Sequence, residues 1–152
     1  MNSKKNFLII IPVLNEQNNI GPMAKKIFSQ LRKKTNILFI DDNSTDGTRK
    51  QIYKVKKKYK NIYLIKRNSK LGIGSAHKCG LRWAYKKKYS IIITMDCDGT
   101  HDPIHLKKLI NFIPNYEIIT TNRFLKKNAL SDWDIWRKCL TKVRHNLIRF
   151  LL

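Results

Sequence analysis

Two groups of aspartates follow the most apolar stretches of the sequence. Asp96 and Asp98 come directly after the run at 91–95, and the pair Asp41-Asp42 follows the run at 37–40. Such runs are typical of strands buried on both faces of a parallel sheet. Carboxylates at their ends lie where open α/β sheets bind ligands. Two hard oxygen ligands at this spacing suit Mg²⁺ or Mn²⁺, which share their other coordination positions with water and substrate phosphates.

A third acid, Glu16, follows the opening apolar run and Pro12. Carboxylates gathered at one sheet edge raise each other's pKa, so a divalent cation and a ligand rich in hydrogen-bond donors would relieve their repulsion. A nucleotide offers ribose hydroxyls and base N–H groups to Glu16 and Asp42, and phosphates to the metal. Spacing and polarity therefore predict a nucleoside-diphosphate site. The competing interpretation is that Asp98 belongs to an ordinary turn.

The elements that must position these acids alternate along the chain. Apolar runs predict strands at 6–13, 37–40, 62–65, 91–95 and 117–121. Capping residues and helical periodicity predict helices over 20–33, from Gly47 to 59, from the basic loop at 67–74 to 88, over 103–112, and from 131 or 132 to the terminus. Repeated β-α units of this kind predict an α/β fold with a doubly wound, mostly parallel sheet, in one domain over 1–152.

The charge balance is the most unusual bulk property. The 152 residues carry a formal net charge of +22, which favours anionic partners such as nucleic acids, lipid headgroups or phosphorylated substrates. Runs of lysine on polar helix faces can also be merely solvated. No apolar run reaches the 18 residues of a spanning helix. Three widely spaced cysteines without a CxxC pair indicate reduced thiols and a cytoplasmic setting: Cys79, Cys97 and Cys139.

Three other classes fit poorly. A dinucleotide-binding fold needs GxGxxG after the first strand, where this chain has PVLNE and no glycine before Gly21. His101 and His105 have the i, i+4 spacing of a zinc-binding helix, but no Glu follows His101, and Pro103 between them marks a helix start. The 24 lysines outnumber the 8 arginines and match no recognition motif, so no nucleic-acid partner is expected.

Six stretches together resemble one family, the family 2 glycosyltransferases of the GT-A (Rossmann-like) fold. Within that family the chain is similar to the dolichyl-phosphate and polyprenyl-phosphate mannosyltransferases. The last stretch discriminates best between these and other members. The stretches, in order, are IPVLNEQNNI, IDDNSTDGT, KLGIGSAHKCG, MDCDGTHDP, TTNRF and WDIWRKCLTKVRHNL.

The resemblance implies an inverting transfer of a hexose, first of all mannose, from GDP-mannose or a UDP-hexose to a polyprenyl or dolichyl phosphate. It also implies Mg²⁺ or Mn²⁺ as cofactor. The family's catalytic domain continues for several further elements, so we expect this chain to be truncated at its C-terminus. Two alternatives are a family 2 enzyme with a hydroxyl acceptor in surface glycan synthesis, and an inactive sugar-nucleotide-binding fragment.

The resemblance also assigns roles to residues. Asp98 and Arg123 would be catalytic. The metal would be held by Asp96, Asp98 and Thr100. The donor would be bound by Pro12, Leu14, Glu16, Ile40, Asp42, Asp96, Cys97, Arg123 and Arg137, and the acceptor headgroup by Arg123, Lys126, Lys127 and Arg137. The chain departs from the family where Leu14 replaces an aromatic residue, Asn43 a glycine and Cys97 an alanine.

The predicted last helix, over 131–152, is amphipathic. Its apolar stripe fits either core packing or an interfacial membrane helix with basic flanks, and both remain open. The stripe consists of Trp133, Trp136, Leu140, Val143, Leu147 and Phe150. A polyprenyl phosphate acceptor would place the protein in the cytoplasm, peripherally bound at the inner face of the membrane. A membrane-anchoring partner is a further option.

Overall fold

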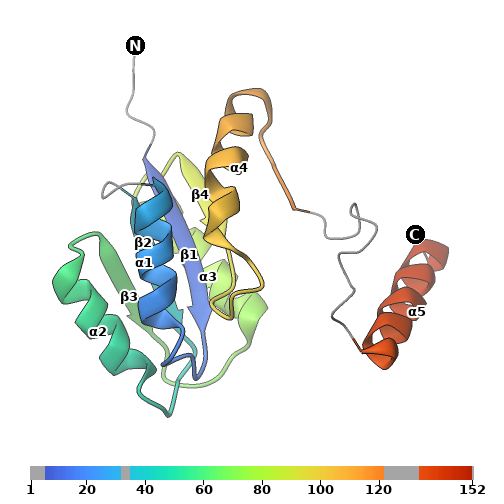
Figure 1. The fold of residues 1–152 in the computed structure, drawn as a ribbon, viewed down its shortest axis with the longest axis horizontal. Coiled ribbons are helices and arrows are strands. Elements are labelled where there is room, and N and C mark those ends of the chain that lie inside the picture. The colour runs from blue at the N-terminus through green and yellow to red at the C-terminus, as the bar shows by residue number, and fades with distance from the viewer. Residues whose placement is uncertain (1–5, 32–34, 122–133, 152) are drawn as a thin grey trace. The chain divides into compact units, whose positions relative to one another are not determined.

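The computed structural model of the chain describes residues 6–31, 35–121 and 134–151. The chain forms two compact units, Met1–Phe112 and Ile113–Leu152, and each is described by itself. The first unit contains a parallel sheet with four strands in the order β3-β2-β1-β4 (Figure 1). Its elements are β1 (Phe7–Val13), α1 (Ile20–Leu31), β2 (Asn36–Asp41), α2 (Thr48–Lys58), β3 (Ile62–Lys66), α3 (Ile73–Lys86), β4 (Ile91–Thr94), the 3₁₀ turn η1 (Pro103–His105) and α4 (Leu106–Phe112).

The strand order brings the predicted acids to one edge of the sheet. The chain runs outward from β1 through β2 to β3, and then returns across the sheet to place β4 on the other side of β1. Val13 lies opposite Asp41 in the β1–β2 pair, and Ile10 lies opposite Thr94 in the β1–β4 pair. The carboxyl ends of β1 and β4 therefore flank the point where the winding reverses, which is the usual ligand position in such sheets.

The two faces of the sheet are covered by different helices, so the predicted doubly wound α/β fold is confirmed. Helices α1 and α2 lie on one side of the sheet and α3 on the other (Figure 1). Ile9 and Ile11 of β1 pack in the cluster with residues of α1 and α2, while Leu8 and Ile10 pack in the cluster with residues of α3. This division follows from the alternation of side chains along a strand. A Cβ added at Gly80 of α3 would lie 2.7 Å from Ile10 Cγ2, so glycine allows this helix to approach the sheet closely.

The second unit contains a 3₁₀ turn, η2 (Ile113–Asn115), and the helix α5 (Ile135–Leu151). The predicted strand at 117–121 is wrong, because these residues have no strand conformation and Ile118 is 87% exposed. A short β-branched run becomes a strand only when a neighbour pairs with it, and no described strand does so here. None of the described helices combines the length and apolarity needed to cross a bilayer.

Candidate functional site

A pocket of about 370 Å³ opens at the carboxyl edge of the sheet. It brings together segments that follow β1, β2 and β4 with the start of α3. The lining residues are Pro12, Val13, Leu14, Glu16, Asp42, Lys70, Gly72, Ile73, Ala76, Asp96, Cys97 and Asp98. Ligand pockets in proteins commonly have volumes of about 300–1,000 Å³. The acids after three different strands thus share one pocket, as their positions in the sequence predict.

None of the other predicted site residues that the structure describes lines this pocket. Ile40 is fully buried in the core on the α3 side and is not among the residues lining the pocket. Thr100 follows the β4 acids in an exposed turn. Arg123, Lys126 and Lys127 lie outside the described residues. Arg137 belongs to α5 in the second unit, and its side chain is not described.

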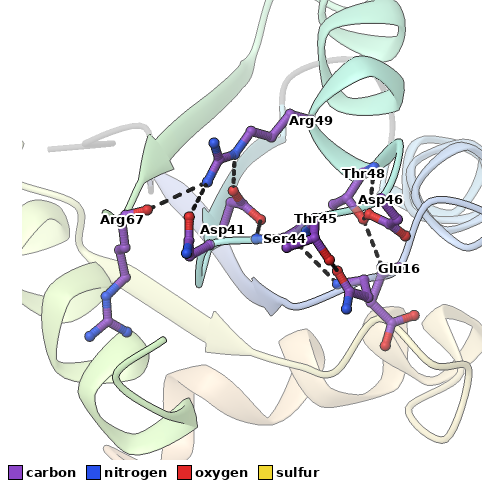
Figure 2. A network of polar contacts seen from close by, with 10 residues as sticks. Glu16, Asp41, Ser44, Thr45, Asp46, Thr48, Arg49 and Arg67 are labelled. Atoms are coloured by element: carbon purple, nitrogen blue, oxygen red, sulfur yellow. Dashed lines mark hydrogen bonds and ion pairs between the residues drawn. The ribbon is translucent and has the colours of Figure 1, made fainter. Parts of the chain in front are cut away.

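The loop after β1 is fastened to the loop after β2 by hydrogen bonds in both directions (Figure 2). The Asn15 amide donates to Ser44 Oγ at 2.9 Å, and Asn15 Oδ1 accepts from the Thr45 amide at 2.9 Å. The Glu16 amide donates to Thr48 Oγ1 at 2.7 Å. With the backbone of Glu16 fixed in this way, its half-buried carboxylate remains at the pocket, where it accepts from Asn19 Nδ2 at 2.6 Å.

Asp41, the last residue of β2, is a buried anchor. Its carboxylate forms an ion pair with Arg49 of α2 and accepts a hydrogen bond from the Ser44 amide at 3.1 Å. Arg49 Nη2 also donates to Asn43 Oδ1 at 3.2 Å (Figure 2). Asn43 has a φ of 67°, in the left-handed region that favours glycine. Asparagine tolerates this region better than other side chains, which explains how it can replace the glycine usual in the resembled family.

Asp42, by contrast, lines the pocket, and its carboxylate is fixed by an ion pair and by backbone amides. It is 5% exposed, and its Oδ1 lies 2.9 Å from Arg67 Nη1. The amides of Leu71 and Gly72 donate to the same carboxylate at 3.0 and 2.8 Å. The loop that carries these amides also supplies Lys70 and Gly72 to the pocket wall. The predicted donor residue Asp42 therefore also organises the wall beside it.

The acids after β4 are more open. Thr100 donates to Asp98 Oδ1 through its amide at 2.9 Å and its hydroxyl at 2.7 Å. Burial alone would raise the pKa of Asp98, but the hydrogen bonds from the hydroxyl and the amide of Thr100 outweigh it and hold the pKa below its usual value. Asp98 is consequently ionised at neutral pH. The Thr100 hydroxyl, predicted as a metal ligand, is engaged with this carboxylate.

Asp96 is half-exposed and its amide donates to Nδ1 of His101 at 3.0 Å. This bond requires an unprotonated Nδ1, so the 3.7 Å between that nitrogen and Asp96 Oδ2 is no ion pair in this tautomer. Within the described ranges, neither Asp96 nor Asp98 forms an ion pair with a lysine or arginine. No three His, Cys, Asp or Glu side chains converge there into a ready-made metal site.

Cys97, between these acids, is buried at the pocket and 3% exposed. Burial raises the pKa of its thiol to about 12, with further contributions from the negative charges of Glu16, Asp98 and Asp96. The side chain is therefore a neutral thiol at physiological pH. It contributes an apolar surface to the site and no nucleophile.

Sequence reasoning missed the pocket wall formed by Lys70, Gly72, Ile73 and Ala76, and the part played by Arg67. The signal for the wall is present in KLGIGSA, which predicts a basic loop leading into a helix and contributes to the family resemblance, but to which no binding role is assigned from the sequence. The importance of Arg67 had no local signal, because its carboxylate partner lies 25 residues earlier in the sequence (67 minus 42).

The parallel α/β fold and the acidic pocket at the carboxyl edge of its sheet are accompanied by a family match. The sequence profile described as Glycosyl transferase family 2 matches residues 8–148, and the chain belongs to this family. Among curated relatives, the polyprenol monophosphomannose synthase of Mycolicibacterium smegmatis is 29% identical over 147 residues, 95% of this chain and 55% of the relative. The dolichol-phosphate mannosyltransferase of Saccharomyces cerevisiae is 26% identical over 148 residues, 94% of this chain and 54% of the relative. The chain thus spans about half the length of the curated relatives it matches.

Solved structures show the same fold. The mannosyltransferase PcManGT from Pyrobaculum calidifontis, in complex with GDP-Man and Mn²⁺, has a TM-score of 0.56 and 24% identity over 64% of this chain and 28% of that one. S. aureus TarS in complex with UDP-GlcNAc has a TM-score of 0.61 and 20% identity over 80% of this chain and 38% of that one. Both likenesses support the predicted GT-A architecture.

Proposed function

We propose that this chain carries the nucleotide-sugar site of a glycosyltransferase that moves mannose from GDP-mannose, or a hexose from its UDP derivative, to a polyprenyl phosphate. The observation that carries this proposal is the convergence of Glu16, Asp42, Asp96 and Asp98 in one pocket. The curated relatives named above support the choice of sugar and acceptor, because both are named for mannosyl transfer to polyprenol or dolichol phosphate.

In this proposal the nucleoside occupies the part of the pocket near β1 and β2. Glu16 and the remaining accepting position on Asp42 would take hydrogen bonds from ribose hydroxyls or base N–H groups. Pro12 and Leu14 would provide the apolar surface against which the base or ribose packs. Leucine offers less contact area than an aromatic side chain, so stacking would contribute less here than in relatives with an aromatic residue.

The residues after β4 fit a divalent cation. Asp96 and Asp98 present carboxylate oxygens at the pocket, without a lysine or arginine partner among the described residues, and Asp98 is ionised. Two carboxylates form too small a set for a cage made of protein alone. They suit Mg²⁺ or Mn²⁺, which take further ligands from water and the donor's phosphates. When bound, such an ion stabilises negative charge on the departing diphosphate.

The acceptor needs little from the protein for its activation. A phosphate monoester is largely ionised at pH 7, so its oxygen can attack the anomeric carbon while the bond from that carbon to the nucleoside diphosphate breaks. Inversion follows from attack opposite the leaving group. No general base is required for this acceptor, whereas a hydroxyl acceptor would need one. Arg123 and Arg137, assigned through the family's motifs, would neutralise phosphate charge, with Lys126 and Lys127 near the acceptor.

We also propose that α5 lies on an anionic bilayer at the cytoplasmic face. Trp136, Leu140, Val143 and Leu147 are 57–80% exposed and follow one stripe of the helix. Exposed basic residues of the same helix include Lys142 and Arg144. An apolar stripe with basic flanks is the pattern of helices that rest in the headgroup region. This arrangement would bring the chain to a lipid-linked acceptor.

The test is transfer of labelled mannose or glucose from GDP-mannose or UDP-glucose to a short polyprenyl phosphate, with and without EDTA. We expect a metal-dependent, acid-labile sugar phosphate as product. Transfer to a hydroxyl acceptor would instead give an acid-stable glycoside. Calorimetric binding of the sugar nucleotide without turnover would support the sugar-nucleotide-binding alternative. Activity that survives both EDTA and Asp98→Ala would exclude the metal role, and absence of both binding and transfer would reject the proposal.

A further inference from the structure

Arg67 is a buried arginine that lies directly after β3 and is 9% exposed. Its guanidinium bonds to three partners: Asp42 Oδ1 at 2.9 Å, the Gly72 carbonyl at 3.3 Å and Ser75 Oγ at 2.6 Å. An arginine at such a position stays charged and presents its donors in a rigid, planar fork. The side chain thus joins the acid after β2, the loop at 67–72 and the first turn of α3.

The loop and Arg67 together occupy most of the accepting capacity of Asp42. Oδ1 accepts from Arg67 and from the Leu71 amide, and Oδ2 accepts from the Gly72 amide at 2.8 Å and more weakly from Leu71 at 3.2 Å. A carboxylate has about four lone-pair sites. Little more than one site remains for an outside donor, so the loop determines which oxygen, and in which direction, Asp42 can offer to a ligand.

The same loop forms part of the pocket wall. Lys70, Gly72 and Ile73 line the pocket, while Arg67 does not. Gly72 has a φ of 85°, so its backbone conformation is one that a residue with a side chain rarely adopts. Because the carbonyl of Gly72 bonds to Arg67 and its amide bonds to Asp42, this turn is fixed on both sides. Arg67 lies behind the wall and holds its position.

We propose that Arg67 is a positioning residue of the nucleoside subsite, which sets affinity for the sugar nucleotide by fixing Asp42 and the wall formed by Lys70, Gly72 and Ile73. This inference rests on the proposed function, since it assumes that the pocket takes a nucleoside. It assigns the loop a binding role that its basic composition alone does not reveal. Arg67 would act on the donor through Asp42 and the loop, without touching it.

Arg49 provides a matched control within the same fold. It also pairs with an aspartate at the end of β2, Asp41, but neither of these two residues lines the pocket. Figure 2 shows the Arg67 carbonyl facing Arg49, while the Arg67 side chain extends away from it. Loss of either guanidinium should therefore lower the melting temperature. Only loss of Arg67 should alter the pocket.

The experiment compares wild type, Arg67→Met, Arg67→Lys and Arg49→Met in the full 152-residue chain. Binding of GDP-mannose and of UDP-glucose with Mg²⁺ is measured by calorimetry well below every melting temperature. We expect Arg67→Met to weaken binding of the preferred donor by roughly tenfold or more, which is the scale of losing one charge-assisted contact network. Arg67→Lys should recover part of this loss, and Arg49→Met should stay within about twofold of wild type. Where transfer is measurable, KM for the donor should rise more than kcat falls.

Equal donor affinity in wild type and Arg67→Met would overturn the inference. Equal weakening in Arg67→Met and Arg49→Met would also overturn it, because the effect would then follow general stability. Should Arg67→Met not fold, Arg67→Lys against Arg49→Lys supplies the same comparison. A wild-type chain that binds neither sugar nucleotide would reject the proposed function and the inference together. Binding by wild type that is unaffected by Arg67 would reject the inference alone.

Discussion

The loops after β2 and β4 carry similar acids at the same edge of the sheet but treat them in opposite ways. Asp41 and Asp42 are 0% and 5% exposed, and each is paired with an arginine. Asp96 is partly exposed and Asp98 is exposed, and neither has an arginine or lysine partner among the described residues. A strand that ends on two acids can therefore provide either a scaffold or an open ligand site. The outcome depends on whether arginine side chains of the protein pair with the carboxylates, as they do for Asp41 and Asp42.

Position in the sheet accounts for this difference. β2 lies between β1 and β3, and the loop after it is covered by α2 and by the residues after β3, which supply Arg49 and Arg67. β4 lies at the end of the described sheet, and the turn after it bonds mainly to itself through Thr100. The charge of a buried carboxylate must be balanced by a cation or by hydrogen-bond donors of the protein, whereas an exposed carboxylate is solvated by water and stays available to a ligand.

The largest effect should come from removing the scaffold acid. We expect Asp41→Ala to lower the free energy of unfolding by about 3 kcal/mol, because it leaves Arg49 without its carboxylate partner and the Ser44 amide without its acceptor. Chemical denaturation measures this change. Asp46→Asn is the control, since Asp46 is an exposed acid in the same loop and should cost less than about 1 kcal/mol. Similar losses in the two variants would contradict the scaffold role of Asp41.

The open acid should show the reverse pattern. Asp98→Asn should leave stability nearly unchanged and reduce transfer by about a hundredfold, the scale of losing one group that stabilises transition-state charge. Because the pKa of Asp98 is held below its usual value, its contribution to donor binding should persist through mildly acidic pH and fade only as the pH falls through that lowered pKa. Asp102→Asn, in the following exposed turn, is the matched control for activity. A stability loss equal to that of Asp41→Ala would remove the contrast between the loops.

Much of the fold could be predicted from the sequence because its signals are local. The apolar runs at 37–40, 62–65 and 91–95 became β2, β3 and β4, and their alternation with helical segments indicated the parallel sheet. The run at 117–121 is also rich in β-branched residues, but it has no strand beside it in the described structure. Pairing is a non-local property, which explains why composition succeeded for the first three runs and failed for the fourth.

The residue types of the candidate site could be predicted from the sequence, but the hydrogen bonds and ion pairs between them could not. Glu16, Asp42, Asp96 and Cys97 do line one pocket, because the carboxyl ends of parallel strands must meet at one edge. The sequence could not reveal that Asp42 is bonded to Arg67 and two amides, since these contacts depend on the path of the loop after β3. The two acid groups looked alike until the positions of the arginines were known.

A smaller effect should distinguish backbone conformation from hydrogen bonding in the scaffold loop. Asn43→Ala should cost about 2 kcal/mol, because alanine is disfavoured at a φ of 67° and cannot accept from Arg49. Asn43→Gly loses the same hydrogen bond but accepts the φ, so it should cost about half as much. Thermal and chemical unfolding measure both. Donor affinity should stay within about twofold in either variant, and a larger change in affinity would show that this loop acts on the pocket directly.

The smallest effect concerns Cys97, which is buried between the two open acids. With a pKa of about 12, roughly one thiol in ten thousand is ionised at pH 8, so a thiol reagent should modify exposed Cys139 first and leave Cys97 intact in the folded protein. Peptide mass mapping, with the urea-unfolded chain as control, checks this order.

The pKa of Cys97 in the folded state lies above the value of 9.0 for a free thiol, so folding favours the protonated form. This contribution is complete below pH 9 and is lost as the pH rises toward 12. The stability of wild type should therefore fall relative to Cys97→Ala across that range, and a constant difference would contradict the burial of the Cys97 thiol, which is the main cause of its raised pKa.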